Sequence, residues 1–385
     1  MLEIGDSILL KKRLITYEYR QYLASELARH IGQPSYLIPD AWKFRWGGRA
    51  EITLLLNALS LRCMYHVLAV HFGAHIRGLR GGGESNILLI LSRDQLIADV
   101  ELMSSLNQTL IGACIDDLTW GHGTNTPDPA LQPLIPIGVG VLAIPCIHLL
   151  SSNQERNLLS LMARTQTAEF DAQSHLFEGE MISSLRSASR PDGVELRSNV
   201  HLRIDGNEEE IDVLLIDARS RRLLICELRW MLGPGDPREV QNRKKECLKK
   251  VSQLHRKVEW ISARANAAAA VALNCAQSSE SADHWVTSGV VLIAGFGGMR
   301  SPDGRYPIIP VRLFERAMAK ASSLDALAAW CAGLSWLPRE GKHFNIVKME
   351  IPLADSTTLI VEGGETPDSA ADFLSDAVAC LSHCD

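Results

Sequence analysis

The sequence lacks the marks of secretion and of a membrane anchor. Its nine cysteines are odd in number and include no Cys-x-x-Cys pair, so we expect reduced thiols and a cytoplasmic location. The first residues, MLEIGDSILLKKRL, have no long apolar stretch followed by a small-residue cleavage site. The most apolar run, residues 134–150, contains two prolines and two glycines, which suit buried strands and turns better than a membrane helix.

The sequence also lacks a general excess of positive charge. Its formal net charge is -6, so attraction to nucleic acid would have to come from a local surface. Residues 238–257 supply one, because eight positive and two negative side chains fall on an amphipathic helix predicted to begin after Pro237. A charge run on a helix is often only a solvated face, but it can also neutralise phosphates. The predicted nucleic-acid-binding residues are Arg243, Lys244, Lys245, Lys249 and Lys250.

The length and composition predict a globular protein of two or three domains, since the chain has 385 residues of which 46% are hydrophobic. Residues 1–168 predict a mostly helical α+β domain, with helices at 17–30 and 50–72. Residues 169–300 predict an α/β domain. Residues 301–385 predict a C-terminal extension or cap that packs on it.

The most informative segment is residues 208–229, EEEIDVLLIDARSRRLLICELR, which predicts two apolar strands around a polar turn. If Asp217 faces Arg222 across that turn, Asp212 and Glu227 face each other, because each lies five residues from the turn pair. Directly opposed Cβ atoms in a sheet are roughly 4.5 to 5.5 Å apart, so the two carboxylates would nearly touch. A divalent cation between them would remove the repulsion.

Two carboxylates, waters and a substrate phosphate are the usual ligands of Mg²⁺ in proteins. We therefore predict that Asp212 and Glu227 bind Mg²⁺, or Mn²⁺ in its place. Arg229 lies two residues after Glu227 and so on the same face, where it adds a fixed positive charge.

The elements around this hairpin follow a recognisable order. Residues 176–185 predict a helix, 194–204 a strand, and Asp205-Gly206 a tight turn into the hairpin. The basic helix and a buried strand at 284–294 come next. This order, with an acid followed by acid-x-base, resembles the PD-(D/E)XK nuclease superfamily. The resemblance implies an α/β fold with a restriction-endonuclease-like core: a helix, a three-stranded antiparallel meander, a helix and a strand.

The resemblance also implies roles for single residues. Asp212 and Glu227 match the metal-binding acids, and Arg229 stands where the family has lysine. Gln253, preceded by Lys249-Lys250, matches a glutamine of the second helix. The acid of the first helix is either Glu178 or Glu180: Glu178 shares an apolar stripe with neighbouring hydrophobic residues, whereas Gly179-Glu180 resembles the start of nuclease-related domains.

Arg229 is a departure from the family pattern with chemical consequences. Arginine keeps its proton, so it cannot serve as a general base, although it can stabilise the charge of a phosphorane transition state. A relocated lysine, Lys249 or Lys250, could take the family's lysine role. A third interpretation is a degenerate domain that keeps the fold and still binds nucleic acid but does not cleave it.

The expected function is thus a metal-dependent DNA endonuclease of bacterial antiviral defence or DNA repair. RNA as the substrate is open, because phosphate contacts are common to both. The N-terminal domain is expected to set specificity or to bind a protein partner, and self-association into a homo-oligomer is also open. The simplest alternative is that Asp212 and Glu227 only form ion pairs with Arg229 or Arg203 on a solvated sheet face.

Overall fold

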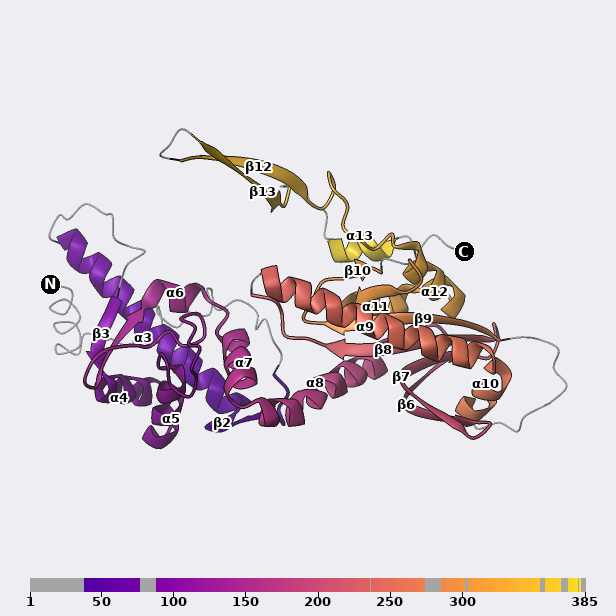
Figure 1. Cartoon of the computed structure of the whole chain (residues 1–385), viewed down its shortest axis with the longest axis horizontal. Coiled ribbons are helices and arrows are strands. Elements are labelled where there is room, and N and C mark those ends of the chain that lie inside the picture. Colours follow the sequence, from indigo (N-terminus) through magenta and orange to yellow (C-terminus); the bar gives the residue numbers. More distant parts are fainter. Residues whose placement is uncertain are drawn as a thin grey trace. The chain divides into compact units, whose positions relative to one another are not determined.

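The computed structural model describes residues 38–76, 88–235, 237–273, 285–301, 304–353, 357–367, 373–379 and 381. The chain divides into two compact units, Met1–Phe177 and Glu178–Asp385, and the division falls within helix α8, Thr167–Ser187 (Figure 1). Each unit is mixed α/β. The helix predicted at 17–30 lies outside the described residues.

The first unit is built around the long helix α3, Arg49–Ile76, and a three-stranded antiparallel sheet in the order β3-β5-β4. The apolar run at 134–150 forms two of these strands and a short helix rather than one long helix, as its prolines and glycines predicted. A small hairpin, β1 (Lys43–Phe44) with β2 (Gly47–Gly48), precedes α3. The remaining elements are β3 (Leu88–Ser92), α4 (Arg93–Ser104), α5 (Gln108–Leu118), β4 (Ile135–Gly138), β5 (Val141–Pro145), α6 (Cys146–Ser151) and α7 (Gln154–Thr165).

One described helix is long and apolar enough to cross a membrane by length and composition alone. This segment of α3, Arg49–Val70, was not expected from the sequence to pass such a test. Its most apolar window is 72% buried inside the protein, which is the usual state of a core helix in a soluble protein. The six cysteines among the described residues are free and buried, in agreement with the expected reduced thiols: Cys63, Cys114, Cys146, Cys226, Cys247 and Cys331.

The second unit contains a six-stranded sheet in the order β10-β11-β9-β8-β7-β6. Strands β6, β7 and β8 form an antiparallel meander, and β9 runs parallel to β8. The turn at Asp205-Gly206 has positive φ angles of 53° and 76°, which explains why an aspartate and a glycine stand there. The strands are β6 (Val194–Ile204), β7 (Asn207–Asp217), β8 (Arg222–Trp230), β9 (Val286–Ala294), β10 (Met299–Arg300) and β11 (Pro307–Pro310).

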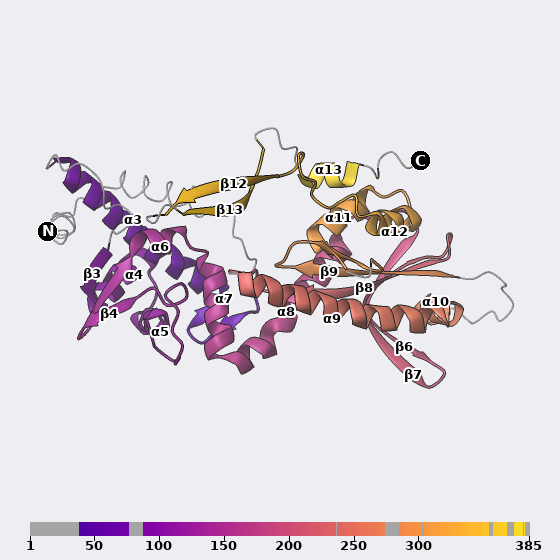
Figure 2. The same ribbon diagram turned by 45° about the horizontal axis from the view of Figure 1, so that its top comes forward.

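Helices cover both faces of this sheet, because the central strands are apolar on both sides. One face packs against α9 (Pro237–Ser262) and α10 (Ala265–Leu273), and the other against α8, α11 (Val311–Lys320) and α12 (Leu324–Gly333). Figure 2 shows α9 on one side of the sheet and α11 with α12 on the other. The predicted helix, meander, helix and strand occur in that order, although α8 is longer than the helix predicted at 176–185.

The C-terminal part of the chain belongs to the same compact unit. Strands β10 and β11 extend the sheet beyond β9, and α11 and α12 contribute to the hydrophobic core. After them come a separate two-stranded ribbon, β12 (Asn345–Pro352) with β13 (Thr358–Glu365), and the short helix α13 (Phe373–Ala379).

Candidate active site

The hairpin that carries the two predicted acids has the expected register. Asp217 pairs with Arg222, and the antiparallel ladder runs from there to Val213 opposite Cys226. Asp217 also accepts hydrogen bonds from the backbone N–H of Arg219 (2.9 Å) and from Ser220, which fixes the turn. Asp212 and Glu227 are the next facing positions, where the ladder has just ended.

Asp212 stands where β7 separates from β8. Its Oδ2 accepts a hydrogen bond from the backbone N–H of Leu228 at 2.7 Å, so the carboxylate takes the place of a strand partner. On the other side of β7, Asn199 of β6 is the position facing Asp212, and this pair is missing from an otherwise continuous register. Asn199 has a left-handed φ of 50°.

The two strands change their packing face at this point. Residues two apart in a regular strand share a face. In β6, however, Leu196 packs on the α8 side while Leu202 packs on the α9 side, and in β7 the same change separates Val213 from Ile211. The change of face around Asn199 and Asp212 thus lies next to the point where the β7–β8 ladder ends, beside the predicted acids.

Glu227 points to the α9 side, since its neighbours Cys226 and Leu228 both pack on the opposite face. Its side chain is completely buried, yet each carboxylate oxygen has an ammonium partner. Oε2 lies 3.3 Å from Nζ of Lys250, and Oε1 accepts a short hydrogen bond from Lys257. Lys250 Nζ also lies 3.7 Å from Oδ2 of Asp212, so one lysine bridges the two acids.

Burial raises the pKa of Glu227, and the nearby charge of Asp212 raises it further. Lys257 and Lys250 act in the opposite direction without cancelling the effect. The site thus consists of two acids and two lysines, formally neutral when all four are charged. This charge balance explains how a fully buried carboxylate can be held there.

Lys257 was not singled out from the sequence, where it is one of several basic residues of α9. It is only 3% exposed and does not lie on the basic surface. The burial of Lys257 could have been predicted from helical spacing. Lys250 and Lys257 are seven residues apart, so they lie on the same side of the helix, and Lys257 is adjacent on the helix surface to the apolar residues Leu254, Val258 and Ile261. Two lysines on the buried row of a helix are expected only where acids receive them.

The remaining predicted residues of α9 form no hydrogen bond or ion pair with the two acids in the described part of the chain. Gln253 is partly buried on the turn between Lys250 and Lys257 and has no hydrogen-bond partner among the described residues. Arg243 donates to the carbonyl oxygen of Leu232 at 2.8 Å, and Lys249 pairs with Glu246 at 2.7 Å. Lys244 and Lys245 are exposed.

Arg229 lies on the α9 side but contacts neither acid of the site among the described residues. Its Nη2 is 3.8 Å from Oε2 of Glu246, and its side chain is 41% exposed. Arg203 pairs instead with Glu208 at 2.9 Å. The alternative of a solvated ion network between the acids and Arg229 or Arg203 is therefore wrong, because Glu227 is buried and bound by lysines.

Neither candidate acid of the first helix is paired with the site in the part of the chain that the structure describes. Glu178 is partly buried and Glu180 is exposed on α8. That helix packs through Met181 and Leu185 on the sheet face opposite α9. The choice between the two acids stays a prediction.

The donor set suits a hard divalent cation, because two carboxylates face each other at the opening of the sheet. Lys250 lies between them, so a cation would have to displace its ammonium group. No group of three or more histidine, cysteine, aspartate or glutamate side chains that could hold a metal is found among the described residues. Asp212 and Glu227 would thus be the only such protein ligands in that part of the chain, with waters and phosphate as the others.

Comparisons with protein-family models, with curated proteins and with solved structures find no match to this chain.

Proposed function

We propose that the chain is a metal-dependent phosphodiesterase, an endonuclease with DNA as the expected substrate, built on a PD-(D/E)XK-like core. The observation that carries this proposal is the pair of acids, Asp212 and Glu227, at the point where two central strands separate, with Lys250 within 3.7 Å of both. An ordinary structural ion pair does not need a second acid beside a buried one.

Asp212 and Glu227 would hold Mg²⁺ or Mn²⁺, which when bound supplies positive charge at the phosphate and makes water a better nucleophile. Lys250 takes the role that the family gives to its lysine. Its ammonium group is on a flexible stem, partly exposed, and can move from the carboxylates to a phosphate oxygen. Gln253, one helical turn further, is positioned to orient the phosphate or the attacking water.

Arg229 and Lys257 have different parts in this proposal. Arg229 is partly exposed at the rim of the site and adds long-range positive charge rather than a proton-transfer group. Lys257 is a positioning residue: its buried ammonium group lowers the pKa of Glu227 and so favours the charged form that a metal needs. Lys244 and Lys245, both exposed on α9, would contact the nucleic-acid backbone.

A second function is favoured by one specific observation, the engagement of both Glu227 oxygens by lysines. In this proposal Lys250 replaces the metal permanently, and the domain is a degenerate nuclease fold that binds nucleic acid or a partner protein without cutting. The buried charges are then already balanced.

The deciding experiment measures cleavage of supercoiled, linear and single-stranded DNA and of RNA, with Mg²⁺ or Mn²⁺ and with chelator. We expect cutting that needs metal and is lost in an Asp212→Ala Glu227→Ala variant. Asp192→Ala, an exposed acid with no partner among the described residues, is the matched control and should cut like the parent. Calorimetric titration with Mn²⁺ then separates the two proposals, because the degenerate module would bind no metal at the acids.

A further inference from the structure

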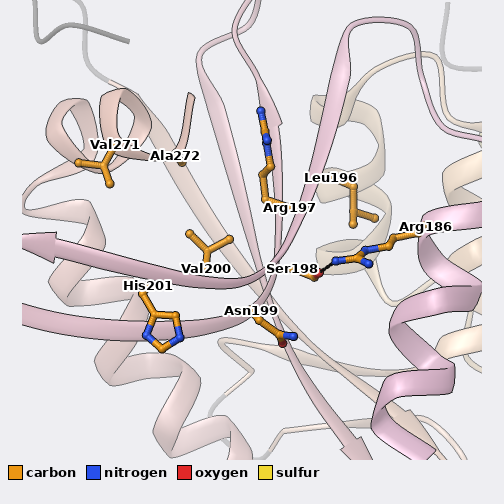
Figure 3. A pocket seen from close by; sticks show the side chains of 9 residues that line it. All are labelled: Arg186, Leu196, Arg197, Ser198, Asn199, Val200, His201, Val271 and Ala272. Carbon is orange, nitrogen blue, oxygen red and sulfur yellow. Dashed lines mark hydrogen bonds between the residues drawn. The ribbon is translucent and has the colours of Figure 1, made fainter. Parts of the chain in front are cut away.

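A groove of about 640 Å³ crosses the edge strand of the sheet in the second unit (Figure 3). Such a volume is within the range of about 300–1,000 Å³ that small-molecule sites usually have. Its floor is β6, with the end of α8 on one side and α10 on the other. The lining residues are Arg186, Leu196, Arg197, Ser198, Asn199, Val200, His201, Val271 and Ala272.

The groove is polar, and the charged side chains that line it in the described part of the chain are basic. Arg186 and Arg197 line it together with His201, and none of the described carboxylates does. The acids bound to these side chains lie outside the lining: Glu195 is 2.7 Å from Arg197, and Glu208 is 3.0 Å from His201. Arg197 and His201 keep 43% and 56% of their side-chain surface exposed, so they can still contact a ligand. An anionic ligand fits this lining.

Asn199 stands in the middle of the groove in a backbone conformation that asparagine adopts more readily than most residues. Its side-chain amide has no hydrogen-bond partner among the described residues, although it can both donate and accept. β6 is the edge strand of the sheet among the described strands, so its outer backbone groups pair with none of them. Left-handed residues within strands cost energy and are concentrated at functional sites.

The bend at Asn199 also explains why the groove crosses the strand edge. Because β6 changes its packing face there, polar side chains before and after the bend line one continuous hollow. Figure 3 shows Arg186 bound to Ser198 on one side of the strand, with Val271 and Ala272 on the other. In the register of β6 and β7, Asn199 is the position opposite Asp212, so the groove lies on the strand next to the one that carries this acid.

We infer that this groove binds the phosphodiester backbone of a nucleic-acid strand and leads it past Asp212. Arg186 and Arg197 contact phosphate oxygens, while Asn199 and His201 contact the adjacent sugar or base. That the ligand is nucleic acid rests on the proposed function, whereas the presence of a basic groove is observed independently of that function. The site is separate from the exposed lysines of α9, and the two surfaces together would hold a strand on both sides of the acids.

The test is fluorescence anisotropy with labelled single-stranded DNA, duplex DNA and single-stranded RNA of equal length, in chelator so that no cleavage occurs. Arg197→Glu should weaken binding about tenfold or more, and Arg197→Ala should lower the salt dependence by about one counterion. Arg197→Lys, which keeps the charge, should recover most of the affinity. Arg316→Glu is the matched control, since Arg316 is exposed on α11 with no partner among the described residues.

The possible outcomes separate this inference from the proposed catalysis. If the parent protein binds nucleic acid without cutting it, and binding is sensitive to Arg197, the result supports the groove as a binding site and contradicts the proposed nuclease activity. A protein that cuts with metal while folded Arg197→Glu and Arg197→Ala bind like the parent overturns the groove alone. Circular dichroism of both variants checks that they are folded, and absence of binding by the parent to all three probes overturns the groove as a nucleic-acid site.

Discussion

Nζ of Lys250 lies 3.3 Å from Oε2 of Glu227, a carboxylate that is completely buried beneath α9. The same ammonium group is 3.7 Å from Oδ2 of Asp212, so it contacts both of the acids that would hold a metal ion. Under the proposed function, Lys250 would therefore be both a competitor of the metal ion and the lysine best placed for catalysis. These two roles predict opposite effects of one substitution.

We expect Lys250→Gln to bind Mn²⁺ more tightly than the parent, by about tenfold, because a positive charge beside the metal site is gone. Cleavage should nevertheless fall by about 10²-fold or more, the usual cost of removing one group that stabilises the transition state. Calorimetry and a single-turnover cleavage assay measure the two effects separately. If metal affinity and cleavage both stay at the parental level, Lys250 has neither role.

Arg229 should be less important than the family pattern suggests. Its guanidinium lies 3.8 Å from Glu246 and is partly exposed, so Arg229→Ala removes only a peripheral charge. We expect cleavage by Arg229→Ala to fall clearly less than cleavage by Lys250→Gln, and Arg229→Lys to retain activity. A loss in Arg229→Ala equal to that of Lys250→Gln would show instead that the arginine itself stabilises the reacting phosphate. A gain of activity only in Arg229→Lys would identify a degenerate nuclease.

The sequence predicted the hairpin well because local chemistry determines its register. Asp217 and Arg222 enclose a turn, Asp205-Gly206 adopts the positive φ angles of a tight turn, and a strand register follows from its turns. The facing of Asp212 and Glu227 was therefore predictable. The basic helix was equally clear from its apolar period.

Features that depend on packing between distant segments were not predictable. The direction of Lys250 and Lys257 depends on which row of α9 meets the sheet. Lys257 was counted only with the surface charges, and Lys250 was named both as a nucleic-acid-binding residue and, with Lys249, as a possible relocated lysine. The bend at Asn199 has no local signature, since asparagine in a strand is not unusual enough to indicate a left-handed residue. The extra N-terminal length of α8 includes Phe170, which packs against Trp42 of the first unit, a contact between segments far apart in the sequence.

Asp212 should be replaceable by asparagine without loss of the fold. The side-chain oxygen of Asp212→Asn can still accept from the N–H of Leu228, whereas Asp212→Ala leaves that donor without a partner. We expect Asp212→Ala to lower the free energy of unfolding by about 1–3 kcal/mol and Asp212→Asn by clearly less. Both should lose Mn²⁺ binding. Urea denaturation and calorimetry test this, and equal destabilisation by the two variants would argue against the backbone contact.

The left-handed backbone of Asn199 gives a prediction about stability that is independent of function. Asn199→Gly should change the free energy of unfolding by less than about 1 kcal/mol, because glycine adopts positive φ without strain. Asn199→Val should cost at least about 1–2 kcal/mol, since a branched side chain clashes in this conformation. The ranking is read from thermal or urea unfolding of the two variants. A valine variant as stable as the glycine variant would mean that β6 is regular at this position.

Lys257 gives the prediction that links charge to pH. The pKa of Glu227 is raised by burial and by Asp212, and Lys257 lowers it, so Lys257→Met should raise that pKa further. Because the carboxylate must be charged to hold a metal, the acidic limb of the pH dependence of Mn²⁺ binding and cleavage should move to higher pH.

The raised pKa of Glu227 also makes the free energy of unfolding depend on pH. An acid with a raised native pKa stabilises the folded state fully at pH values below its unfolded pKa, and this stabilisation is lost as pH rises through the native pKa. Lys257→Met should therefore lose more stability than the parent between acidic and neutral pH. Lys320→Met, an exposed lysine of α11, is the control, and an unshifted acidic limb in folded Lys257→Met would exclude a positioning role.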